Sequence, residues 1–300
     1  MAQLSSEQRP VWIAGGRGML ATALAACLER CGVGFVATDS ELDVSDAERV
    51  RAFVQREKPG LIVNAAAYTR VDDAEAQRAD AFRVNATGAE NLARAAGELG
   101  VRLLHYSTDY VFDGNASLPY REDHPTAPSS AYGESKARGE ELVRALLPND
   151  SVIVRTSWLF GENGNNFVKT MLGLMRSRAE VRVVADQRGR PTYTHDLAQV
   201  SLALCGVFGD PPADPGTYHF ANSGPTTWHG FTLGIRDVCL ELGLALQIEH
   251  IVPVTTAEFP RPAKRPLYSV LDTRKIEAFL GGQARSWRDA LRAYLVNEIT

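Results

Sequence analysis

The sequence is poor in cysteine, in long apolar runs and in excess charge of one sign. Four scattered cysteines are too few for a disulfide framework, so we expect free thiols and a reducing, cytoplasmic setting. Charged residues interrupt every long apolar run, which argues against a membrane span or a membrane partner. A net charge of −4 gives no reason to expect nucleic acid as a partner. What is present is 45% hydrophobic content in 300 residues, enough to bury a substantial core.

Short β-branched runs alternate with helical patterns through the first half of the chain. Before them, the polar residues 1–10 lack the apolar core of a signal peptide and are expected to be a disordered lead-in. Strands are expected at 11–14, 34–38, 61–64, 102–106 and 151–154, and helices after residue 18 and at 47–56, 80–99 and 131–147. This alternation with continuous apolar strands predicts an α/β protein with a Rossmann-like, doubly wound parallel sheet.

The character of the chain changes after Ser157, where polar and proline-rich loops separate the elements. We expect residues 1–160 to form a dinucleotide-binding domain, completed by part of 193–220. A smaller C-terminal lobe, formed by 161–192 and 221–300, is expected to bind the substrate at the carboxyl ends of the strands. Within it the sequence predicts a helix at 231–242 and an extended stretch at 248–254.

A glycine-rich turn follows the first expected strand and opens a helix. The spacing Gly15-x-x-Gly18-x-x-Ala21 lets the backbone approach a pyrophosphate, which then faces the helix N-terminus. Asp39 ends the second strand, where a carboxylate accepts from the adenosine ribose hydroxyls and favours NADH, although a simple turn residue is the alternative. Arg17 fits the 2′-phosphate of NADPH, so the choice between NADH and NADPH stays open.

Tyr132 and Lys136 lie four positions apart in an expected helix, so their side chains project from the same face. A nearby ammonium favours the ionised phenol. Bringing the phenol pKa from about 10 to near neutrality requires about 4 kcal/mol of differential stabilisation. A phenol tuned in this way is a general acid for reducing a ketone. Beside a dinucleotide site, the pair predicts hydride transfer to a carbonyl.

Longer motifs connect these features along most of the chain. They are NAAAYT at 64–69 with Val71 and Asp72, HYSTDYVF at 105–112, YGESK at 132–136, RTSW at 155–158, GNNF at 164–167, DQxGxPT at 186–192, TTWH at 226–229, Arg265-Pro266, Ser269 and LDT at 271–273. In this combination the chain resembles the dTDP-4-dehydrorhamnose reductase family, within the extended short-chain dehydrogenase/reductase superfamily.

The resemblance implies reduction of the C4 ketone of a dTDP-linked 4-keto-6-deoxyhexose by NADPH or NADH, most directly dTDP-4-dehydrorhamnose to dTDP-L-rhamnose. Tyr132 would donate the proton, Lys136 would assist it and hold the nicotinamide ribose, and Thr108 would polarise the substrate oxygen. The expected cofactor-binding residues are Gly15, Gly18, Met19, Leu20, Asp39, Asp43, Val44, Ala66, Ala67, Tyr106, Tyr132 and Lys136. The expected contacts to the sugar nucleotide are Thr108, Asp109 and Trp158.

The second half of the chain adds weaker expectations. Some members of the family use Mg²⁺, held by carboxylates at a subunit contact, and a homodimer is among the expected partners. His195 stands where an acidic ligand is expected, so no metal is predicted. Trp228 and His229 are interpreted as capping the helix that follows.

Rival activities are separated by a few residues. Dehydration is disfavoured because Tyr110 follows Asp109, where sugar-nucleotide dehydratases place a glutamate. Two alternatives stay open: a related dTDP-4-ketosugar reductase of antibiotic deoxysugar synthesis, such as the dihydrostreptose type, and a non-catalytic dinucleotide-binding subunit like the β subunit of methionine adenosyltransferase. The intact set of Thr108, Tyr132 and Lys136 favours an enzyme.

Overall fold

A six-stranded parallel sheet forms the centre of the computed structural model, which describes residues 9–299. Of the lead-in expected at 1–10, residues 1–8 lie outside the described residues. The strand order is β10-β5-β4-β3-β1-β2. The strands are β1 (Val11–Ala14), β2 (Phe35–Thr38), β3 (Leu61–Asn64), β4 (Arg102–Thr108), β5 (Ser151–Thr156) and β10 (Gly216–His219). Val11 pairs with Phe35 on one side and Leu61 on the other. The predicted α/β class with a doubly wound sheet is confirmed.

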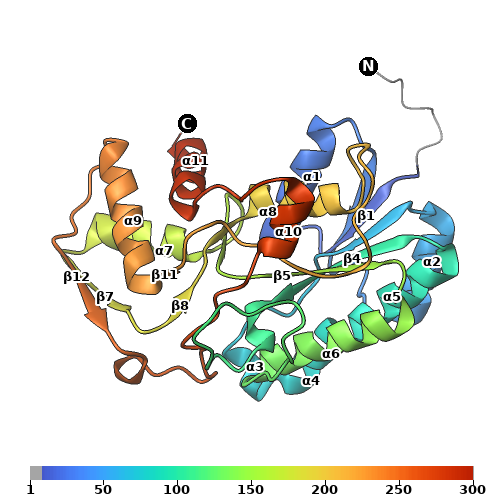
Figure 1. The fold of residues 1–300 in the computed structure, drawn as a ribbon, viewed down its shortest axis with the longest axis horizontal. Helices are drawn as coiled ribbons and strands as arrows, with labels where there is room; N and C mark the ends of the chain where they lie inside the picture. Colours follow the sequence, from blue (N-terminus) through green and yellow to red (C-terminus); the bar gives the residue numbers. More distant parts are fainter. Residues whose placement is uncertain (1–8, 300) are drawn as a thin grey trace.

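Helices cover both faces of this sheet (Figure 1). One face packs against α1 (Met19–Arg30), α8 (Thr194–Leu204) and α10 (Arg274–Leu280), and the other against α2 (Ala47–Glu57), α5 (Gly88–Leu99) and α6 (Ala131–Leu146). Alternate strand residues point to opposite faces, so Ile13 packs with the first set and Trp12 with the second. Burial on both sides explains why the strands are apolar without alternation.

The helix expected at 80–99 is not a regular α-helix. After the short α3 (Asp73–Ala76), it consists of α4 (Arg78–Phe82), a π-helical turn η1 (Arg83–Thr87) and α5. The wider turn places Asn85 so that its side chain accepts from the Tyr68 backbone N–H at 2.8 Å and donates to Ser135 Oγ at 2.9 Å. Gly139 of α6 provides room, because an added Cβ there would lie 2.3 Å from the Asn85 carbonyl oxygen. This tertiary packing, rather than local preference, interrupts the helix.

A second set of elements packs around its own apolar core beside the sheet (Figure 1). Its helices are α7 (Phe167–Ser177), α9 (Trp228–Glu241) and α11 (Trp287–Ile299). Its paired strands are β7 (Glu180–Val184) with β12 (His250–Val254), β6 (Leu159–Phe160) with β9 (Thr192–Tyr193), and β8 (Arg188–Gly189) with β11 (Thr226–Thr227). Short 3₁₀ turns occur at η2 (Asp109–Val111) and η3 (Thr256–Glu258). None of the described helices is long and apolar enough to span a bilayer.

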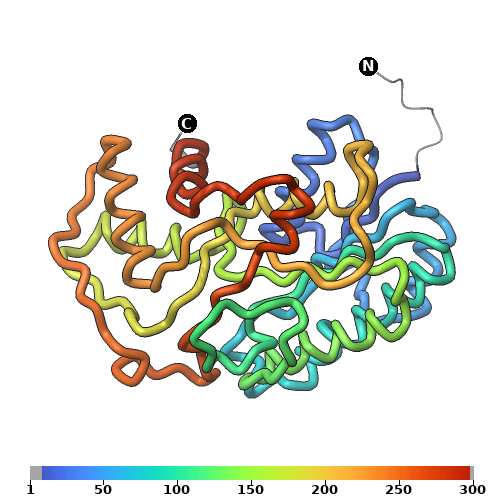
Figure 2. Tube along the Cα trace, in the orientation of Figure 1, coloured from blue at the N-terminus to red at the C-terminus, as the bar shows by residue number. Residues whose placement is uncertain are grey.

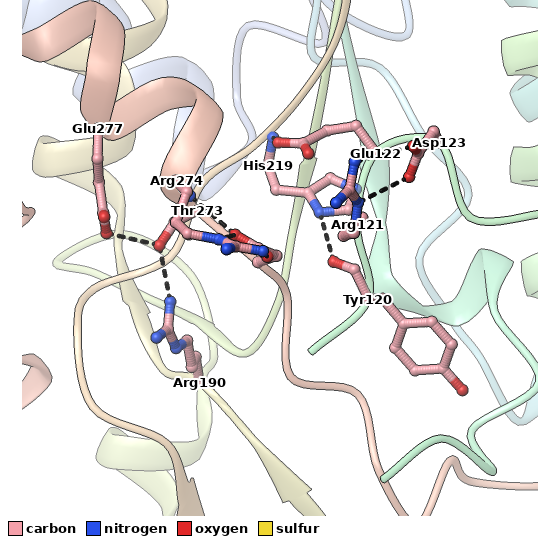
Figure 3. A network of polar contacts seen from close by, with 10 residues as sticks. Tyr120, Arg121, Glu122, Asp123, Arg190, His219, Thr273, Arg274 and Glu277 are labelled. Atoms are coloured by element: carbon pink, nitrogen blue, oxygen red, sulfur yellow. Dashed lines mark hydrogen bonds and ion pairs between the residues drawn. The ribbon is translucent and has the colours of Figure 1, made fainter. Parts of the chain in front are cut away.

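The chain crosses between the two parts several times. Figure 2 shows the gold segment that carries β10 returning to the sheet built by the blue and green part of the chain. Polar contacts join the parts (Figure 3): Arg190 donates to Thr273 Oγ1 at 2.9 Å, and that hydroxyl donates to Glu277 Oε1 at 2.7 Å. Nearby, the His219 ring at the end of β10 is hydrogen-bonded to the Tyr120 carbonyl oxygen at 3.1 Å. The contacts of Arg190 therefore tie the second set of elements to the start of α10 on the sheet.

Candidate active site

The glycine turn lies where the strand order reverses, between β1 and β3. Gly15 has a φ of +84°, and an added Cβ would lie 2.6 Å from the Cα of Ala66, so only glycine fits there. Gly18 begins α1 without a side-chain cap, so the first N–H groups of the helix are available to an anion. Open α/β sheets bind ligands at this reversal point.

One cavity of about 910 Å³ opens at the carboxyl ends of the strands. All fifteen residues predicted to bind cofactor or substrate line it. They are Gly15, Gly18, Met19, Leu20, Asp39, Asp43, Val44, Ala66, Ala67, Tyr106, Thr108, Asp109, Tyr132, Lys136 and Trp158. The structure therefore brings them together, and their individual roles stay predictions.

Asp39 and Arg17 lie at the same rim of the cavity. The Asp39 carboxylate accepts from the backbone N–H groups of Arg17 at 3.0 Å and Ser40 at 2.8 Å. The Arg17 guanidinium is exposed and pairs with Glu41 at 3.3 Å. A guanidinium and a carboxylate thus both lie at this rim, so the choice between NADH and NADPH stays open.

Helix α6 positions the tyrosine and the lysine. Ser130 caps its N-terminus by accepting from the Gly133 N–H at 3.2 Å. Gly133 allows close approach to the preceding loop, because an added Cβ would lie 2.2 Å from the Tyr110 carbonyl oxygen. One turn later, buried Lys136 donates from Nζ to the Tyr106 carbonyl oxygen at 2.6 Å. Tyr106 thus contributes its backbone to the site, while its side chain packs in the core beside α1 and α8.

The pKa of Tyr132 shifts in the direction opposite to the one expected. Burial raises the pKa of this phenol above its ordinary value, and the neighbouring Thr108 hydroxyl offsets part of the rise. Burial also lowers the pKa of Lys136 to about 8, and its ammonium is bonded to a backbone carbonyl. The phenol is therefore protonated at neutral pH, which is the state that a proton donor requires.

Asp109 presents a carboxyl group to the cavity beside Thr108. Thr108 Oγ1 donates to Asp109 Oδ1 at 3.0 Å, whereas Oδ2 is buried without a hydrogen-bond partner among residues 9–299. Burial raises the pKa of Asp109 to about 6. The neutral and ionised forms of this group therefore balance near pH 6, about two pH units above the ordinary range of an aspartate.

Asp109→Asn is expected to stabilise the protein increasingly as the pH rises. Because the folded-state pKa of about 6 lies above the ordinary 3.8, the folded state loses stability as the pH rises through 6, and asparagine removes this loss. The difference in the free energy of unfolding between variant and wild type should grow by up to about 3 kcal/mol from pH 4 to pH 7.5. Urea unfolding at both pH values measures it. The exposed Glu180→Gln serves as the control, and a pH-independent difference for Asp109→Asn would contradict the expectation.

The loop between β6 and α7 reaches from the second part of the chain to the glycine turn. Asn163 Nδ2 donates to Thr22 Oγ1 on α1 at 2.9 Å, and the adjoining Gly164 and Asn165 line the cavity. Asn166 holds the loop shape, since it caps α7 and donates to the Gly161 carbonyl oxygen at 2.8 Å. The loop thus closes the end of the cavity beside the start of α1.

Asn163→Ala is expected to weaken dinucleotide binding about fivefold, because one exposed hydrogen bond contributes about 1 kcal/mol. Turnover at saturating dinucleotide should stay unchanged, since Asn163 does not line the cavity. Calorimetric titration with NADPH and NADH measures the affinity. Thr22→Ser keeps the accepting hydroxyl and should bind normally, and equal affinities for all three proteins would exclude the bridging role.

Trp158 and Trp228 form an aromatic wall of the cavity. Their rings stack with centroids 3.6 Å apart and planes 9° apart. The interpretation of Trp228 as a helix cap is wrong: Thr227 caps α9 by accepting from the Gly230 N–H, while Trp228 lies in the first turn and faces the cavity. The sequence feature that could have predicted this position is the aromatic residue of the TTWH motif, which stands at the start of the expected helix.

A family model described as RmlD substrate binding domain matches residues 9–299. The chain is also 41% identical over 292 residues to the dTDP-4-dehydrorhamnose reductase of Streptomyces griseus, covering 96% of this chain and 94% of that protein. The chain belongs to the dTDP-4-dehydrorhamnose reductase family. The predicted resemblance is thereby confirmed.

Two further relatives are similar to nearly the whole of this chain. The solved dTDP-4-dehydrorhamnose reductase of Bacillus anthracis, in complex with NADP, matches with a TM-score of 0.88 at 38% identity, over 97% of this chain and 99% of that one. A protein of Streptomyces antibioticus named as a probable dTDP-4,6-dihydroxy-2-methyloxan-3-one 4-ketoreductase is 41% identical over 289 residues, 93% of this chain and 92% of that protein.

The Mg²⁺ expected for some members of the dTDP-4-dehydrorhamnose reductase family does not fit the residues around His195. His195 Nε2 lies 3.2 Å from Glu162 Oε2, and its ring stacks on Tyr193 with centroids 5.1 Å apart. Mg²⁺ prefers six oxygen ligands, whereas this pair supplies one imidazole and one carboxylate. Residues 9–299 also contain no cluster of three or more histidine, cysteine, aspartate or glutamate side chains arranged for a metal.

Proposed function

We propose that this protein reduces the C4 ketone of a dTDP-4-keto-6-deoxyhexose with NADPH or NADH, most directly dTDP-4-dehydrorhamnose to dTDP-L-rhamnose. The observation that carries the proposal is that Thr108, Tyr132 and Lys136 line the same cavity as the glycine turn at Gly15. Membership of the dTDP-4-dehydrorhamnose reductase family supports the sugar, and the relative in complex with NADP supports the dinucleotide.

The residues around the glycine turn fit a dinucleotide. The missing Cβ of Gly15 and the free N–H groups at the start of α1 suit a pyrophosphate, and the small side chains of Ala66 and Ala67 leave room beside it. When bound, the dinucleotide supplies the hydride for the ketone carbon. Lys136, with its ammonium held against the Tyr106 carbonyl oxygen, is placed to bind the ribose hydroxyls.

The reduction places negative charge on the carbonyl oxygen, which must receive a proton. Tyr132 holds that proton at neutral pH, since the ordinary pKa of a phenol, about 10, already lies above 7 and burial raises the pKa of Tyr132 further. Thr108 stands beside the phenol and orients its own hydroxyl through its bond to Asp109. Hydride to carbon and the Tyr132 proton to oxygen together convert the ketone into an alcohol, and solvent then restores the proton to Tyr132.

A second sugar remains a specific alternative. The Streptomyces antibioticus relative is named for reduction of a different dTDP-linked ketosugar, at an identity equal to that of the Streptomyces griseus relative. Reductases of antibiotic deoxysugars would use the same three residues, so the pocket of the second lobe decides between substrates. We assign residues 161–192 and 221–300 to that lobe as part of the proposal, with the exception of α10, which packs on the sheet.

The test is NADPH and NADH oxidation with dTDP-4-keto-6-deoxy-L-lyxo-hexulose, generated in place and compared with other dTDP-4-ketosugars. We expect the highest kcat/KM for the rhamnose precursor and dTDP-L-rhamnose as the product by NMR. Faster reduction of another ketosugar would favour the antibiotic-sugar alternative. Absence of turnover with every ketosugar, together with co-purification with a methionine adenosyltransferase, would favour the regulatory subunit.

The proposal also includes the cellular setting and the oligomeric state. A cytoplasmic setting is supported by the four cysteines, which are all free thiols within the described part of the chain. A homodimer follows from the family resemblance, and light scattering during gel filtration would measure it directly.

A further inference from the structure

Trp158 carries an unusual backbone conformation. Of the non-glycine residues in the described part, only Lys58 and Trp158 have a positive φ, at +46° and +48°. Lys58 ends helix α2, where the left-handed conformation is common. Trp158 instead follows β5 at the edge of the cavity, and a bulky side chain keeps this conformation only where its surroundings fix it.

Two contacts fix the Trp158 ring. Trp228 stacks on it at a centroid distance of 3.6 Å. Gly189 lies against its edge, since an added Cβ there would approach Trp158 Cε2 to 2.6 Å. These two contacts are themselves linked, because Gly189 pairs with Thr226, two residues before Trp228, in the β8–β11 ladder.

Trp228 is anchored more firmly than Trp158. Its indole Nε1 donates to Gln187 Oε1 at 3.2 Å, and Gln187 in turn donates to Thr256 Oγ1 at 3.0 Å. Phe167 packs against the Trp228 ring with centroids 4.5 Å apart. The Trp228 ring is therefore held in place by residues of the second part of the chain, and the Trp158 ring stacks on it.

We propose that Trp228 is a positioning residue that sets the Trp158 ring for binding of the sugar nucleotide. This inference rests on the proposed function, since it concerns the affinity of that site for its substrate. A flat indole surface binds the apolar face of a deoxysugar or a pyrimidine ring, and it binds best when the ring is already held in place. Without Trp228, the strained Trp158 backbone relaxes, and the Trp158 indole no longer keeps the orientation that binds the substrate.

The test uses Trp228→Leu, Trp228→Phe and Gly189→Ala in the full-length protein. Trp228→Leu should raise the KM for the ketosugar nucleotide about tenfold, the upper range for a lost aromatic pair. The kcat and the affinity for NADPH should stay within about twofold, since Trp228 acts on substrate binding. Trp228→Phe keeps an aromatic plate and should show a smaller rise. Gly189→Ala should raise KM with Trp228 intact, because it displaces the Trp158 ring.

A spectroscopic readout separates positioning from a general structural effect. Two stacked indoles give an exciton couplet in far-ultraviolet circular dichroism, so Trp228→Leu and Trp158→Phe should both abolish it. The matched control is Trp287→Phe, which changes a tryptophan outside the cavity lining and should leave both couplet and KM unchanged. A normal KM in Trp228→Leu with the couplet lost would overturn the inference, as would a normal KM in Gly189→Ala.

A different result would show that the proposed function, rather than the positioning role of Trp228, is wrong. If the wild type reduces no ketosugar, the proposed function is wrong, whereas calorimetric titration with dTDP still compares the wild type with Trp228→Leu. A loss of dTDP affinity in the variant would then support the positioning role, and equal affinities would overturn it. If Trp228→Leu fails to fold, Trp228→Phe and Gly189→Ala carry the same comparison.

Discussion

Tyr132→Phe is expected to lower turnover about a hundredfold or more while dinucleotide affinity stays nearly unchanged. The substitution removes the hydroxyl that gives up the proton and keeps the ring, which packs edge-on against Tyr110 at a centroid distance of 5.6 Å. The bond between Lys136 and the Tyr106 carbonyl oxygen is untouched. Steady-state NADPH oxidation measures turnover, and calorimetry measures affinity.

Two controls make this result specific. Tyr120→Phe removes another tyrosine hydroxyl, which donates to Asp113 Oδ1 away from the cavity lining, and should leave turnover normal. Lys136→Ala should reduce both turnover and dinucleotide affinity, because the ammonium serves both the phenol and the ribose. Near-normal turnover in Tyr132→Phe would refute the assignment of the proton donor.

Arg155→Met is expected to destabilise the fold by about 3–5 kcal/mol. Arg155 donates to both carboxylate oxygens of Glu140, at 2.8 Å and 2.6 Å, and the two side chains are 2% and 0% exposed. Burial alone would raise the pKa of Glu140, but hydrogen bonding to Arg155 and its charge hold it at about 2. Without Arg155, the buried carboxylate loses its buried cation and keeps the more exposed Arg144 guanidinium at 2.9 Å. Urea unfolding at pH 7 measures the loss.

The pH dependence and two further variants check the cause. In Arg155→Met the pKa of Glu140 should rise, so part of the lost stability should return as the pH falls and the carboxyl group is protonated. Arg144→Met removes a half-exposed partner of the same carboxylate and should cost about 1 kcal/mol or less. The double variant Glu140→Leu/Arg155→Met removes both charges and should be more stable than Arg155→Met alone. A loss below about 1 kcal/mol in Arg155→Met would contradict the buried-charge argument.

The first half of the fold was predictable because its signals are local. β1 and β3 lie where the apolar runs predict them, and α6 begins at residue 131, as predicted. The π-helical turn at Arg83–Thr87 was not predictable, since its residues read locally as helix and Asn85 gains its partners from Tyr68 and Ser135. Long-range packing decided that segment.

In the candidate site, too, some features follow from the sequence and others from long-range packing. Spacing alone brought Tyr132 and Lys136 to one helix face, and the motifs predicted fifteen residues that line one cavity. The direction of the Tyr132 pKa depends instead on how deeply the phenol is buried and on which group the Lys136 ammonium contacts. Neither quantity is encoded in a spacing of four residues.

The sequence by itself determined the α/β class, the glycine turn, the pairing of Tyr132 with Lys136 and the family, because each depends on the order and spacing of neighbouring residues. Only the tertiary structure decided that Trp228 supports Trp158, that Asn163 bridges to α1 and that burial rather than a cation controls the Tyr132 pKa. Those features depend on contacts between segments far apart in the chain and on exclusion of water. Both arise only when the chain has packed.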